Sequence, residues 1–139
     1  MMEQIMTDLM NYAFDHQINV ILTKDLPVTT VSITKVKLRT VIINTRYYIP
    51  EQIPLQFAHE IGHVIHNDDA ARPLAFTSIY SDSKLEKSAH TWAIKKLLPY
   101  YLEDKEPEYI NAYDFMESFA IPGHLYPVVV NAIHEAYCS

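Results

Sequence analysis

The sequence predicts a single α+β domain over residues 1–139, with a small sheet between an N-terminal helix and a set of C-terminal helices. Apolar residues recur at helical spacing over residues 2–16 and again from about residue 54. Between these segments lie stretches rich in Val, Ile and Thr, which favour strands. Because helices and strands are segregated along the chain, an α+β fold is favoured over alternating βαβ units. The length of 139 residues suits one domain with its own core.

Three segments are expected to form the sheet, namely residues 18–22, 29–34 and 38–44. A proline-containing turn separates the first two segments. The last two are close enough in sequence for a tight hairpin around residues 35–37. We therefore expect a small and mostly antiparallel sheet.

The second half of the chain is expected to be helical. A helix should run from about residue 54 to 66 or 67, since a proline near the first turn costs little. Another should run from about residue 83 to 98 and stop before Pro99. Two further helices are expected around residues 109–120 and 125–137.

Composition excludes several classes of protein. The net charge is -6 and no basic stripe is visible, so a direct nucleic-acid partner is not expected. No run approaches the roughly 18 apolar residues that a membrane span needs. The single cysteine, Cys138, cannot form an internal disulfide, and acidic residues near the start do not suit a secretory signal. We expect a cytoplasmic protein that does not associate with a membrane.

The segment His59-Glu60-Ile61-Gly62-His63 carries the chemistry. His59 and His63 are four residues apart, so on a helix both imidazoles leave the same side and can hold one tetrahedral zinc ion. Glu60 lies about 100° around the helix from His59, which suits a carboxylate that takes a proton from water activated by zinc. The simpler alternative is a solvent-exposed helix face that happens to carry two histidines.

The surrounding residues favour zinc. Apolar residues are expected to form a stripe on the opposite side of the same helix, which turns the histidines away from the core. This stripe consists of Phe57, Ala58, Ile61 and Val64. Gly62 is a poor helix former, but its missing side chain allows another element to approach the metal side closely.

Glu86 is the best candidate for a third ligand. It shares a helix face with Ala89, Ala93 and Leu97, which are all apolar. An ionised carboxylate on a buried stripe is costly unless it is paired or binds a metal. The alternative is a carboxylate bonded to lysine or backbone groups.

Other residues compete for roles at the site. Asp69 follows His59 by ten residues, where another class of zinc peptidase has its third ligand, but the glycine expected at the turn is His66 here. His66 itself is better interpreted as structural. His90 lies one turn beyond Glu86 and could be a ligand, although a hydrogen bond to a ligand or stabilisation of an oxyanion is favoured.

The remaining histidines and tyrosines give weaker indications. No spacing singles out His16, His124 or His134. Any of several tyrosines could polarise a substrate carbonyl, among them Tyr80, Tyr100 and Tyr101. With ten tyrosines in the chain, none of them can be assigned this role from sequence.

Two segments together resemble the ImmA/IrrE family of metallopeptidases, which occur in phages, integrative elements and bacterial stress regulators. One is the motif that begins at His59, and the other begins at Glu86 and ends in Leu-Leu-Pro. The second family signature is roughly Glu-x-x-Ala-Asn-x-Phe-Ala followed by Leu-Leu-Met-Pro. Here His90, Trp92 and Leu98 replace its asparagine, phenylalanine and methionine.

The resemblance implies a zincin-like helix, with His59, His63 and Glu86 as zinc ligands and Glu60 as the general base. It further implies a zinc-dependent endopeptidase that cuts a specific protein, a helix-turn-helix repressor of a phage or mobile element. His90 would stabilise the oxyanion. The alternative is a zinc-stabilised, non-catalytic module that inactivates the repressor by contact. The sequence does not indicate an oligomeric state.

Overall fold

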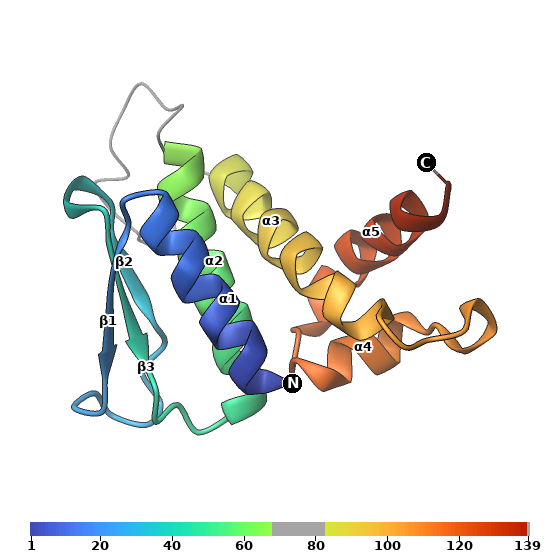
Figure 1. Ribbon diagram of the computed structural model, residues 1–139, viewed down its shortest axis with the longest axis horizontal. Helices are drawn as coiled ribbons and strands as arrows, with labels where there is room; N and C mark the ends of the chain where they lie inside the picture. The colour runs from blue at the N-terminus through green and yellow to red at the C-terminus, as the bar shows by residue number, and fades with distance from the viewer. Residues whose placement is uncertain (68–82, 139) are drawn as a thin grey trace.

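A computed structural model describes residues 1–67 and 83–138 and confirms the α+β class. In this part of the chain the strands are short and the helices dominate (Figure 1). The helices are α1 (Met2–Asp15), α2 (Ile53–Asn67), α3 (Ser83–Leu102), α4 (Ala112–Ser118) and α5 (Tyr126–Cys138). The strands are β1 (Asn19–Thr23), β2 (Ile33–Lys35) and β3 (Thr40–Asn44). No helix among the described residues is both long enough and apolar enough to span a bilayer.

Helix α2 occupies the centre of the molecule. It packs against α1, β2 and β3 on one side and against α3 on the other (Figure 1). Helix α5 packs on α3 and α4, at the side of the molecule away from the sheet. The predicted apolar stripe of α2 is confirmed, because all four of its side chains are buried. Glu60 and His63 are buried as well, so α2 is enclosed on more than its apolar side.

The sheet is mixed, and the prediction of a mostly antiparallel sheet is wrong in this respect. The strand order is β1-β3-β2. The expected hairpin is present, with β2 antiparallel to β3, but β1 pairs with β3 in parallel over five residues. Strand β3 takes the centre because it is the most buried strand, whereas β1 and β2 carry more exposed side chains.

The segment between β1 and β2 is held by the side chain of Asn44. This side chain is fully buried, and its Nδ2 donates to the carbonyls of Pro27 at 2.8 Å and Thr30 at 2.7 Å. The Asn44 backbone N–H in turn donates to the Ser32 hydroxyl at 3.1 Å. A buried amide needs such partners, so this one side chain fixes the path of the connection around the central strand.

Helix α3 continues through Pro99 to Leu102, so the prediction that it stops before Pro99 is wrong. Leu98 and Tyr101 are buried in the core, and their packing stabilises the last turn despite the backbone hydrogen bond that proline cannot make. The helix expected over residues 109–120 is shorter than predicted. It begins after Asn111, whose side chain accepts hydrogen bonds from the first backbone N–H groups of α4.

Candidate metal centre

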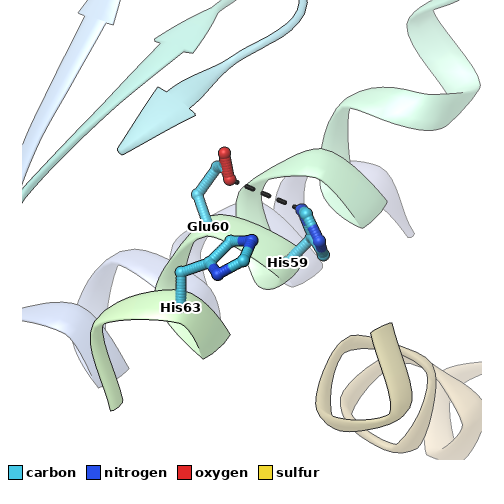
Figure 2. A group of neighbouring side chains, drawn as sticks. All are labelled: His59, Glu60 and His63. Carbon is cyan, nitrogen blue, oxygen red and sulfur yellow. Dashed lines mark ion pairs between the residues drawn. The ribbon is translucent and has the colours of Figure 1, made fainter. Parts of the chain in front are cut away.

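The motif residues lie in the middle of α2 and are largely enclosed. Figure 2 shows His59, Glu60 and His63 on the same stretch of helix, with Glu60 projecting towards the side where the strands lie. The Oε2 atom of Glu60 lies 3.4 Å from Nδ1 of His59, the ion pair drawn in Figure 2. This buried oxygen accepts no hydrogen bond from the described residues. A buried carboxylate oxygen of this kind requires a nearby cation or proton.

Glu86 from α3 contacts both imidazoles of α2. Its Oε1 lies 2.8 Å from Nε2 of His63, and its Oε2 lies 3.2 Å from Nε2 of His59. Two ligands of a tetrahedral zinc ion with bonds of 2.0–2.1 Å are separated by about 3.3 Å. The separation of 3.2 Å to His59 is close to that value, whereas the separation of 2.8 Å to His63 is shorter and is typical of a hydrogen bond. Glu86 therefore contacts both imidazoles, one with each of its oxygens, and a common ion held by the three residues stays a prediction.

The close approach of α3 depends on Gly62. A methyl group placed on Gly62 would lie 3.3 Å from both the Cα atom and the carbonyl oxygen of Ala89. Such contacts are tight, and both involve backbone atoms that cannot turn away. Since Glu86 lies about one turn before Ala89, this glycine sets how near the carboxylate comes to the histidines. The predicted role of Gly62 in allowing a close approach is confirmed.

The donor atoms fall into two compact groups that share His59. One group consists of His59, Glu60 and His63, and the other consists of His59, Glu86 and His90. Within each group, one potential ligand atom from every residue lies within 4.8 Å of the others. Glu86 links the groups by contacting both His59 and His63. Imidazole nitrogens with carboxylate oxygens are a donor set that zinc prefers. Both groups offer donor types that zinc accepts, but neither group contains His59, His63 and Glu86 together.

The carboxylates alter the acid–base properties of the site. Burial opposes a positive charge on His59, but contact with Glu60 and Glu86 outweighs it and raises the pKa of this imidazole to about 9. Contact with His59 and then His63 holds the pKa of the Glu86 carboxyl well below its usual range. Without metal, the proton that His59 keeps offsets part of the negative charge beside it.

His90 completes the surroundings of the site. Its ring stacks on that of His59 with centroids 4.2 Å apart, and its Nε2 lies 3.8 Å from Oε2 of Glu86. Its Nδ1 is buried and has no hydrogen-bond partner among the described residues. Burial, followed by the positive charge of His59, lowers the pKa of His90 to about 4. A neutral imidazole here can donate one hydrogen bond.

The structure adds one residue that the sequence did not single out. The exposed ring of His124, just before α5, stands edge-on to that of His90 with centroids 6.2 Å apart. Three imidazoles, those of His59, His90 and His124, therefore extend from the enclosed centre to the surface. No spacing in the sequence could indicate this, because His124 comes from a separate element whose position depends on tertiary packing.

Other candidates are engaged elsewhere or lie outside the described residues. Nδ1 of His66 is 2.7 Å from the Gly62 carbonyl oxygen, which agrees with its structural interpretation. The hydroxyl of Tyr100 donates to Asp8, and that of Tyr101 bonds to Asn111 and Asp114. The alternative ligand Asp69 and the candidate Tyr80 fall outside the residues that the structure describes.

Comparison with protein-family models, curated proteins and solved structures finds no match for this chain. The site is therefore interpreted from its own residues and their geometry.

Proposed function

We propose that this protein is a zinc-dependent endopeptidase. The observation that carries the proposal is the contact of one carboxylate, from Glu86 on α3, with Nε2 of both His59 and His63 on α2. Two imidazoles and one carboxylate leave a fourth tetrahedral position for water or substrate, as is usual in catalytic zinc sites. Glu60 lies beside this set without being needed as a ligand, which suits a general base.

Each residue of the site would have a separate role in the reaction. Zinc, when bound by His59, His63 and Glu86, would lower the pKa of water from 15.7 to about 7 and polarise the scissile carbonyl. Glu60 would take the proton from the attacking water and return it to the leaving amine nitrogen. The neutral imidazole of His90 would donate a hydrogen bond to the carbonyl oxygen as negative charge develops there.

The substrate is proposed to be a protein, through an extended segment. Strand β2 is an edge strand, and the hydroxyl of Thr34 in this strand donates to the backbone carbonyl of Glu60 at 3.3 Å. Among the described residues no strand pairs with the outer side of β2, and such an edge can align an extended peptide through backbone hydrogen bonds. By the resemblance of its motifs to the ImmA/IrrE family, the protein cut would be a helix-turn-helix repressor of a phage or mobile element.

A second function is favoured by one observation, the position of His90. His90 forms a compact group with His59 and Glu86, so it could supply a fourth protein ligand. A zinc ion with four protein ligands is usually structural. The protein would then act as a zinc-stabilised module that inactivates its repressor by contact. The two proposals differ in whether Glu60 is required.

The Glu60→Gln variant separates the proposals. Purified zinc-loaded protein is incubated with purified helix-turn-helix repressors, taken first from the genes that flank its own, and products are followed by mass spectrometry. We expect wild-type protein to yield two fragments, and Glu60→Gln to yield the same fragments at a rate at least roughly a hundredfold lower, because the base is lost. Equal zinc content in the two proteins is the control. Cleavage by Glu60→Gln at the wild-type rate would contradict the mechanism, and relief of repression by this variant would favour inactivation by contact.

A further inference from the structure

Two hydrogen bonds join strand β2 and the residue before it to the stretch of α2 that carries the motif. The backbone N–H of Ser32, which immediately precedes β2, donates to Oε1 of Gln56 at 2.8 Å. Two residues further on, the hydroxyl of Thr34 donates to the backbone carbonyl of Glu60 at 3.3 Å. Ser32 is only 5% exposed, so water cannot readily replace Gln56 as the acceptor of its N–H.

The spacing of these two bonds shows that β2 and α2 lie side by side and run in the same direction. Gln56 and Glu60 are four residues apart, which is about 6.0 Å along a helix. Ser32 and Thr34 are two residues apart, which is about 6.6 Å along a strand. Because the two repeats nearly match, alternate residues of the strand meet successive turns of the helix. The turn after β2, Val36–Leu38, also packs on α2, so the alignment continues beyond the strand.

The side chain of Gln56 is itself held in place. Its Nε2 donates to Oε1 of Gln52 at 2.9 Å, and Nε2 of Gln52 donates to the carbonyl of Ala120 at 2.8 Å. With its Nε2 engaged in this way, the amide of Gln56 presents its oxygen to Ser32. Gln52, Gln56 and Glu60 follow one another at intervals of four residues, so they lie on one side of α2.

Pairing with β3 restrains β2 over only a short length. The ladder between the two strands covers three residues, from Ile33 to Lys35. On its outer side β2 has no strand partner within the described part of the chain. The bonds to α2 therefore restrain the strand from a second direction, and they tie it to the helix on which Glu60 lies.

We propose that Gln56 and Thr34 are positioning residues that hold β2 in register with Glu60. This inference rests on the proposed function, in which Glu60 is the base and β2 aligns the extended substrate. The Glu60 side chain projects towards the side where the strands lie (Figure 2). A peptide paired with β2 takes its position from the strand, so the register sets where the scissile bond lies relative to Glu60. A displacement of about 1 Å is enough to slow a reaction on the order of a hundredfold.

Steady-state cleavage of a repressor that the zinc-loaded wild type cuts tests the inference. Gln56→Met keeps a side chain of similar length but removes the strong acceptor, and Thr34→Val replaces the hydroxyl by a methyl group. We expect kcat/KM to fall about tenfold or more in each variant, because the paired substrate is displaced from Glu60. Thr34→Ser retains the hydroxyl and should retain most of the activity.

Thr45→Val is the matched control. The hydroxyl of Thr45 also donates to a backbone carbonyl of the sheet, that of Thr23, at 2.9 Å, so this variant loses the same kind of bond. We expect it to lower the melting temperature about as much as Thr34→Val does and to keep the wild-type kcat/KM. Wild-type kcat/KM in both Gln56→Met and Thr34→Val, or an equal loss in Thr45→Val, would overturn the positioning role. A wild-type protein that cuts no repressor would contradict the proposed function itself.

Amide hydrogen exchange tests the hold on β2 without any activity. In Gln56→Met the amide of Ser32 should exchange roughly tenfold faster than in wild type, because its acceptor is lost. Gln4→Met makes the same change on α1, where the side chain of Gln4 bonds to Asp8, and it should leave the Ser32 amide protected. Equal protection of Ser32 in Gln56→Met and wild type would show that Gln56 does not hold the strand, whatever the outcome of the cleavage assay.

Discussion

At the scale of single residues, the candidate metal centre combines two negatively charged carboxylates with a set of imidazoles that can carry a proton or bind a metal ion. Local periodicity was sufficient to predict that His59 and His63 lie on one side of a helix and that Glu86 faces inwards on another. It could not predict how the two helices cross, so the stacking of His90 on His59 and the approach of His124 had to come from the structure.

The raised pKa of His59 predicts how zinc affinity depends on pH. Zinc binds the unprotonated imidazole, and in the metal-free protein His59 keeps its proton up to about pH 9. Zinc affinity should therefore increase about tenfold per pH unit between pH 6.5 and 9, with one proton released per ion bound. A competition titration with a chelating dye at several pH values measures this. An affinity already level above pH 6.5 would show that His59 titrates as an ordinary histidine.

At the scale of elements, the contact between α2 and α3 positions the ligands. The presence of Gly62 within a helical pattern indicated a close approach before the neighbouring helix was known. By contrast, the parallel pairing of β1 with β3 could not be foreseen, because it depends on which strand is buried most in the assembled core. The passage of α3 through Pro99 has a similar cause, since packing of Leu98 and Tyr101 outweighs the local preference.

Replacing Gly62 by alanine should separate metal binding from stability. The added methyl group forces α3 back by a few tenths of an ångström and withdraws Glu86. We expect zinc affinity to fall about tenfold, as when groups that orient metal ligands are removed. Stability should change little, because alanine gains about 1 kcal/mol in helix propensity and offsets the strain. Gly123→Ala is the control, since nothing lies within 4 Å of the added methyl, and its zinc affinity should match wild type.

At the scale of the whole molecule, the candidate ligands join its two parts. Helix α2 belongs with the sheet and α1, while α3 carries α5 and, through it, α4. A metal ion held by residues of α2 and α3 would therefore connect both parts of the core. Among the described residues, one hydrophobic cluster runs through all of these elements.

Zinc should consequently raise the thermal stability of the protein. Zinc at about a hundred times its dissociation constant contributes about 2.7 kcal/mol if only the folded state binds it. For a domain of this size we expect the melting temperature to rise by roughly 5–15 °C, and a chelator should reverse the change. Differential scanning calorimetry of wild type, Glu60→Gln and His63→Ala tests this. The shift should persist in Glu60→Gln, and a full shift in His63→Ala would show that the ion binds elsewhere.

The most direct test of the central claim is the location of zinc in crystals of the loaded protein by anomalous diffraction at the zinc edge. We predict one ion per chain, with Nε2 of His59 and of His63 at 2.0–2.1 Å, one oxygen of Glu86 at 2.0–2.2 Å, and a fourth position taken by water. An ion bound away from α2 and α3 would contradict the proposed centre, and His90 as a fourth protein ligand in place of water would contradict catalysis.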